Sequence, residues 1–171
     1  IRRASLAGVI LRMLSLQLGV LEQFPFIDMP DSRAINDGWQ DLSELGAIDR
    51  QRRLTAVGLQ MARLPVDVKL ARMLVAARHH DSLQEMIAIA AFMGIADPRE
   101  RPADAKQAAD AAHAIFADSS SEFLGVIRLW RAFRQMHEDL GQNQLRRWCE
   151  RHFLSYLRMR EWRELHRQLL I

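Results

Sequence analysis

The chain has 171 residues, of which 49% are hydrophobic and 26% are charged, a composition that excludes a disordered chain and favours a folded, soluble one. The length suits one compact domain or two small ones. The longest apolar run, at residues 86–93, is far shorter than the roughly 20 residues of a membrane-spanning helix, so we expect no membrane span.

The first residue of the chain and its cysteine content bear on whether it comes from a longer protein and on its cellular location. Because the sequence begins with Ile1 rather than Met, we expect it to be an excised piece of a longer protein. No signal peptide is visible, and the single cysteine, Cys149, cannot form an internal disulfide. Both features agree with a cytoplasmic location.

Positive charge is concentrated in the C-terminal third. Residues 123–171 contain ten arginines, no lysine and five acidic residues, whereas the first 122 residues contain fourteen basic and sixteen acidic residues. Guanidinium groups bind phosphate oxygens well, so this asymmetry favours contacts with nucleic acid. The alternative is a solvated helical face held by ion pairs between residues four apart, such as Arg160 and Glu164.

The pattern of apolar residues predicts a mainly α-helical protein. Apolar residues recur at helical spacing in eight segments, the last of which is either one bent helix or two: 4–18, 32–45, 56–63, 66–78, 82–92, 103–117, 121–138 and 143–170.

A tightly punctuated stretch follows the second predicted helix. Gly46 is suited to a left-handed turn after a helix end, and residues 47–54 can pair as a very short β-hairpin. Thr55 is then a candidate cap for the next helix, and Asp67 for the one after Pro65. Two helices followed by a hairpin are typical of a winged-helix unit.

Several segments of this sequence together resemble a known family. The segments are FPFID at 24–28, LSELGAID at 42–49, LTAVGLQMARLPVD at 54–67, LARML at 70–74, SEFL at 121–124 and WCERHFL at 148–154. In this order they are similar to the helicase-associated region of DEAH-box RNA helicases, and the tail at 155–169 most resembles the bacterial HrpA branch. The family often has S-D-H-L and W-C-x-x-N-F-L in the last two segments, so Phe123 replaces a histidine and His152 an asparagine.

The resemblance implies a winged-helix domain at residues 1–65 and a ratchet-like helical bundle at residues 66–171. In that family the region follows two RecA-like motor domains, which hold ATP and Mg and move 3′ to 5′ along single-stranded RNA. The expected partners are therefore single-stranded RNA and the motor domains of the same protein, and a monomer is favoured.

The motifs of an ATPase are absent from this sequence. It has neither a GxxxxGK[ST] phosphate loop nor a D-E-A-H box, so we expect no cofactor and no ATPase site in this chain. The six histidines lack metal-ligand spacing. The pair Cys149 and His152 lacks an orienting acid, so no catalytic residue is expected. Whether the chain is itself part of an enzyme depends on the longer protein.

The candidate nucleic-acid-binding residues come from two arguments. If the arginine-bearing faces of the last helices meet, they form a groove that can follow a sugar-phosphate backbone, with a tryptophan available either for stacking on a base or for the core. The resemblance adds residues of the two family segments as a channel wall. The candidates are Ser121, Glu122, Arg128, Arg131, Arg147, Trp148, Arg151 and His152.

Two other functions remain open at this point. One is a free-standing winged-helix regulator that binds duplex DNA and has a helical dimerisation domain. It would read DNA with the helix at 32–45, but this helix carries Asp37, Asp41 and Glu44 against Arg33, and phosphates would repel it. A helical adaptor that binds another protein is the third possibility.

Overall fold

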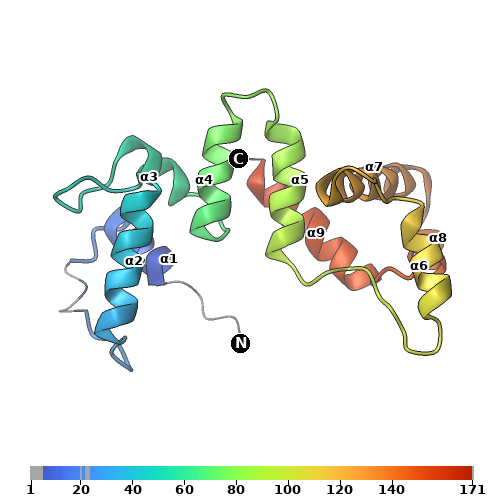
Figure 1. Ribbon diagram of the computed structural model, residues 1–171, viewed down its shortest axis with the longest axis horizontal. Helices are drawn as coiled ribbons and strands as arrows, with labels where there is room; N and C mark the ends of the chain where they lie inside the picture. The colour runs from blue at the N-terminus through green and yellow to red at the C-terminus, as the bar shows by residue number, and fades with distance from the viewer. Residues whose placement is uncertain (1–5, 20, 22–23, 171) are drawn as a thin grey trace. The chain divides into compact units, whose positions relative to one another are not determined.

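The computed structural model describes residues 6–19, 21 and 24–170. These residues form nine α-helices and no β-strand, which confirms the prediction of a mainly helical chain. The chain divides into two compact units, unit 1 (Ile1–Ser82) and unit 2 (Leu83–Ile171). Figure 1 shows the order of the helices. Within the described ranges, no helix is long and apolar enough to cross a membrane.

Unit 1 contains four helices: α1 (Leu6–Ser15), α2 (Ser32–Glu44), α3 (Ala56–Met61) and α4 (Val68–Ala77). Helices α1 and α2 lie side by side, and α4 packs on α3 (Figure 1). The apolar faces of all four helices contribute to one core, in which Ile10, Leu42 and Met61 are fully buried.

The helix ends predicted at Gly46, Thr55 and Asp67 are confirmed. Gly46 has a φ of 66°, and the N–H groups that follow α2 donate back to the carbonyls of Ser43 and Leu42 in the manner of a Schellman motif. The Thr55 hydroxyl accepts a hydrogen bond from the Gly58 N–H at 3.0 Å, and the Asp67 carboxylate caps α4 in the same way. Local side-chain chemistry therefore sets these helix ends.

The predicted β-hairpin at residues 47–54 is wrong. This segment is a tight turn closed by one isolated antiparallel bridge, between Ile48 and Leu54. The Asp49 carboxylate accepts hydrogen bonds from the N–H groups of Gln51 and Arg53, each at 2.9 Å, so the side chain satisfies donors inside the turn. Because α3 begins directly after Thr55, no residues remain to extend the bridge into two strands.

Unit 2 contains five helices: α5 (Leu83–Gly94), α6 (Lys106–Ala114), α7 (Glu122–Asp139), α8 (Gln142–Arg151) and α9 (Tyr156–Leu169). Helix α5 packs against both α7 and α9, and its residues 87–91 are all buried. Trp162 of α9 is fully buried, and its Nε1–H donates to the Ala88 carbonyl at 2.9 Å. Helix α5, which contains most of the long apolar run at residues 86–93, is thus the centre of this unit.

The segment at 143–170, predicted as one bent helix or two, is two helices. Phe153 has a φ of 52° and ends α8, which starts one residue earlier than predicted. The loop before α6 holds this break in place, because the Glu100 N–H donates to the Phe153 carbonyl and the Ser155 N–H to the Pro98 carbonyl, each at 2.8 Å. The change of direction between α8 and α9 is therefore fixed by a segment about fifty residues away in sequence.

Candidate nucleic-acid interface

Arg147 and Arg151 lie one helical turn apart on the exposed face of α8. Together with Leu140, Gln144 and Glu150 they line a groove of about 650 Å³. Among the described residues, neither guanidinium has a hydrogen bond or an ion pair. The α8 groove therefore presents two positive charges that the fold itself does not use.

Trp148 and His152 lie on the core-facing side of α8. Trp148 is 7% exposed, and its ring lies 4.5 Å from the His152 ring and 6.4 Å from the Phe133 ring, measured between centroids. His152 is half-buried, and its Nδ1 donates to the Trp148 carbonyl at 2.8 Å. In this structure Trp148 is a core residue, and its ring is not available for stacking on a base.

Ser121 and Glu122 begin α7. Ser121 occupies the cap position, although its hydroxyl makes no capping hydrogen bond. The exposed Glu122 carboxylate lies 3.4 Å from Arg99 and lines a cavity of about 440 Å³ that Phe116 also lines. Because the Phe116 ring contacts His152, the two family-derived segments approach the same aromatic side chain.

Arg128 and Arg131 of α7 have partners inside unit 2. Arg128 donates to the Ala117 carbonyl at 2.7 Å and lies 2.5 Å from the Asp118 carboxylate, and Arg131 lies 3.4 Å from Glu85 of α5. Hydrogen bonds from Ser120, with a smaller contribution from the charge of Arg128, hold the pKa of Asp118 below its usual value against the effect of burial. These two arginines hold α7 to its neighbours.

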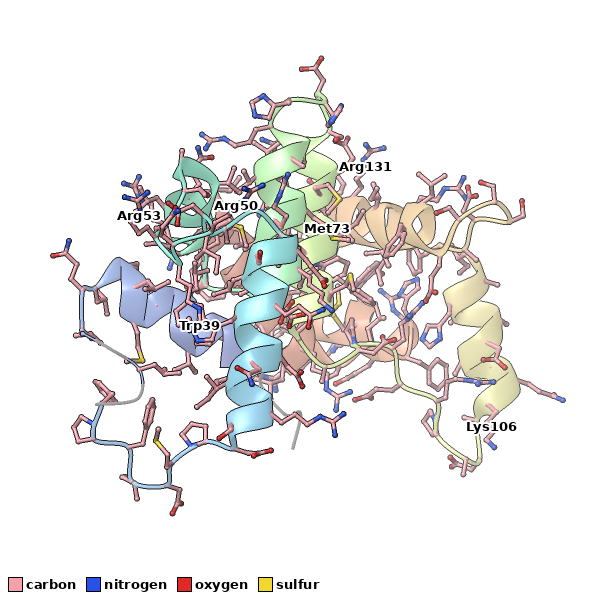
Figure 2. All side chains as sticks on the ribbon, turned by 60° about the vertical axis from the view of Figure 1, so that its left-hand side comes forward. Trp39, Arg50, Arg53, Met73, Lys106 and Arg131 are labelled. Carbon is pink, nitrogen blue, oxygen red and sulfur yellow. The ribbon has the colours of Figure 1, made fainter. Side chains whose placement is uncertain are left out.

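The four predicted arginines do not line one groove. Arg147 and Arg151 share the α8 groove, whereas Arg128 and Arg131 do not line it. Figure 2 shows Arg131 on α7, and Arg50 and Arg53 on the turn of unit 1 that follows Trp39 of α2. Of the eight sequence-derived candidates, the α8 pair is the one that combines exposure with unused charge.

Cys149 has the properties of a core thiol. It is fully buried, and burial, with a smaller contribution from Glu150, raises the pKa of its thiol from 9.0 to about 12. A thiol is nucleophilic only as the thiolate, so this side chain is inert at neutral pH.

The sequence matches two parts of one known family. Residues 39–66 match the helicase associated domain (HA2), winged-helix, and residues 67–156 match the helicase associated domain (HA2), ratchet-like. The chain belongs to the HA2 family. The boundary between the HA2 matches lies between residues 66 and 67, whereas the compact units divide after residue 82, because α4 packs on α3.

Three relatives are longer proteins, and this HA2 chain matches one part of each. It is 44% identical to the ATP-dependent RNA helicase HrpA homolog of Haemophilus influenzae, over 99% of this chain and 14% of the relative. It is 44% identical to the ATP-dependent RNA helicase HrpA of Escherichia coli, over 99% of this chain and 13% of the relative. It is 29% identical to the probable ATP-dependent RNA helicase DHX34 of Homo sapiens, over 98% of this chain and 15% of the relative. The HA2 chain thus spans about a seventh of the length of these relatives.

The sequence analysis did not predict one basic site of this HA2 chain. Arg134 and His137 of α7, and Arg163 and His166 of α9, line a common cavity. Both pairs have the spacing Arg-x-x-His, which places the two side chains of each pair on one helical face. That repeated spacing is the signal that could have found the site.

Proposed function

We propose that this chain is the accessory HA2 region of an HrpA-type ATP-dependent RNA helicase, and that its α8 groove forms part of the wall of a single-stranded RNA channel. RecA-like motor domains of the same protein would form the other wall and would bind ATP and Mg. The observation that carries this proposal is the pair Arg147 and Arg151, two exposed guanidiniums on one helical face without partners in the described chain.

Three observations support the proposal. The two bacterial relatives that are 44% identical to this chain are ATP-dependent RNA helicases by name. Glu150 and Arg151 of the α8 groove lie in the segment that resembles the family's W-C-x-x-N-F-L motif, and Arg147 directly precedes it. Residues four apart on a helix are neighbours on its surface, so Arg147 and Arg151 can bind neighbouring phosphates of one strand.

The groove would act by holding the backbone of the RNA and not its bases. Guanidinium contacts to phosphate carry no sequence information, so a strand can advance past the groove without a change in affinity. The ring of Trp148 takes no part in this role, since it is buried against Phe133 and His152. A motor that closes against this wall would then move RNA of any sequence, in the 3′ to 5′ direction that the family resemblance implies.

The exposed surface of α2 argues against the reading of duplex DNA. Asp37 and Glu44 are exposed, and Arg33 is the single basic residue in that helix. Phosphates of a duplex would repel this face. Unit 1 is therefore proposed to dock on other parts of the longer protein.

The test uses the full-length helicase with Arg147 and Arg151 both changed to Gln. These changes remove two charges without touching an internal contact, unlike changes at Arg128 and Arg131, which would also weaken the fold. We expect the RNA concentration for half-maximal ATPase stimulation to rise about tenfold or more, since charge-assisted hydrogen bonds contribute about 1.5–3 kcal/mol each and exposure reduces this value. Unwinding of RNA with a 3′ overhang should slow in parallel.

The matched control is the double variant Arg33→Gln and Arg63→Gln. Both arginines are exposed in unit 1, so the control has the same net charge but an intact α8 groove. If the two double variants have the same RNA-stimulated ATPase activity and unwind RNA at the same rate, the α8 groove is not part of the RNA channel.

A further inference from the structure

Unit 2 contains a second basic cavity, between the C-terminal halves of α7 and α9, with a volume of about 490 Å³. Arg134 and His137 contribute to it from α7, and Arg163, His166 and Arg167 from α9. We call it the α7–α9 pocket. It shares no lining residue with the α8 groove, so it is a separate site.

His166 is the most informative side chain of the α7–α9 pocket. It is 8% exposed, and its ring lies over the Trp130 ring with 4.4 Å between the centroids. Within the described ranges, its imidazole nitrogens have no hydrogen-bond partner. Its nitrogens are not shut off from solvent, because the buried side-chain nitrogen or oxygen without a partner in the described chain is Trp39 Nε1. The imidazole therefore presents its nitrogens to the cavity as open hydrogen-bonding positions.

The charges around the pocket do not balance. Arg134 pairs with Glu138 at 3.6 Å, and Arg167 pairs with Glu164 at 2.7 Å. The guanidinium of Arg163 has no carboxylate partner among the residues that the structure describes. Three guanidiniums against two carboxylates leave one positive charge without compensation, located at Arg163.

We infer that the α7–α9 pocket binds a phosphate group, with the Arg163 guanidinium and the His166 imidazole as its donors. A phosphodiester carries one negative charge, which compensates the charge left at Arg163. The planar guanidinium suits two phosphate oxygens at once, and a ring N–H of His166 suits a third. The phosphate can belong to an RNA strand, in which case the inference rests on the proposed function and adds a second backbone contact, or to a free nucleotide.

The protonation of both histidines should respond to such a ligand. Burial, and then the charge of Arg134, lower the pKa of His166. Burial, and then the charge of Arg163, lower the pKa of His137, while Glu138 raises it. A bound phosphate offsets the arginines and raises both pKa values, so binding takes up protons and strengthens as the pH falls. The charged groups that face the two rings are Arg134 and Glu138 from α7, and Arg163, Glu164 and Arg167 from α9.

The experiment follows the imidazole resonances of His137 and His166 by NMR in this chain, as three probes are added. The probes are a single-stranded oligouridylate, inorganic pyrophosphate and an oligoaspartate peptide. The test variant is Arg163→Gln, which removes an exposed side chain without an internal partner. The control is Arg160→Gln, on the same helix and with the same charge change, but outside the pocket.

We expect oligouridylate or pyrophosphate to shift the His166 resonance and to raise its pKa. Arg163→Gln should weaken the binding of that probe by at least about fivefold, because it removes a charge-assisted contact. Arg160→Gln should weaken the binding by less than about twofold, because it removes a distant charge that salt screens. Pyrophosphate alone would identify a free nucleotide as the source of the phosphate, and oligouridylate would identify RNA. A His166 resonance that neither phosphate probe moves, equal effects of the two variants, or equal binding of oligoaspartate would each overturn the phosphate site.

The outcome separates this inference from the proposed function. If RNA binding depends on Arg147 and Arg151, and neither RNA binding nor pyrophosphate binding depends on Arg163, the α8 groove stands and the pocket does not. If RNA binding depends on Arg163 alone, the pocket stands and the α8 groove does not.

Discussion

The salt dependence of RNA binding gives the sharpest measure of the α8 groove. The perturbation is the double change Arg147→Gln and Arg151→Gln in this chain, which leaves the hydrogen bonds of the fold intact. Each phosphate that a protein neutralises releases counterions, so the logarithm of the affinity for a single strand falls with the logarithm of salt by about 0.7 per contact. The number of lost contacts can therefore be read from a change in slope.

The structure sets the size of that change. Two guanidiniums without internal partners imply a slope that is shallower by about 1.4 in the double variant. When salt rises from about 50 to about 200 mM, the ratio of wild-type to variant affinity should then fall about sevenfold. Partial engagement of one side chain would reduce the change to about half.

The assay is fluorescence anisotropy of a labelled oligouridylate at several salt concentrations, with Arg33→Gln and Arg63→Gln as the control of equal charge. Thermal unfolding of all three proteins checks that the substitutions leave the fold unchanged. Equal slopes for the two double variants would refute the assignment of Arg147 and Arg151 to phosphate binding. Tighter binding of duplex DNA than of single-stranded RNA at equal salt concentration would refute the single-strand preference.

Three predictions concern the fold that positions these sites, and urea unfolding tests each of them. Gly58→Ala should lower the free energy of unfolding by about 3 kcal/mol, because the added methyl would lie 2.0 Å from the Ala47 carbonyl oxygen. The control Gly8→Ala has open space around the added methyl and should raise the free energy of unfolding by up to about 1 kcal/mol, so equal effects of the two variants would refute the contact at Gly58. Trp162→Phe should cost about 2–3 kcal/mol through the lost Nε1–H hydrogen bond and lost volume, and a cost near zero would contradict the buried position. Burial raises the pKa of the Cys149 thiol from 9.0 to about 12, so the thiol of the unfolded state loses its proton first as the pH rises. The free energy of unfolding should therefore fall by up to about 1.4 kcal/mol per pH unit between pH 9.0 and about 12, and Cys149→Ala should remove this slope.

The predictions that held rest on chemistry between residues close in sequence. The caps at Thr55 and Asp67 and the left-handed turn at Gly46 are each decided within a few residues, so a single sequence contains the whole interaction. The family segments are likewise contiguous, and the family match agrees with them. The hairpin at 47–54 failed because the Asp49 side chain satisfies backbone donors that strands would otherwise share.

The sequence by itself determined a mainly helical chain, the helix ends at Gly46, Thr55 and Asp67, its family and the surplus of arginines in its C-terminal third. The tertiary structure alone decided which arginines are free, because the partners of Arg128 and Arg131 lie on other elements, as far as Glu85, 46 residues away in sequence. It also decided that Trp148 is buried and that His166 lines a pocket without a hydrogen-bond partner. Charge and aromatic content are properties of single residues, whereas exposure and pairing are set by which helices pack together.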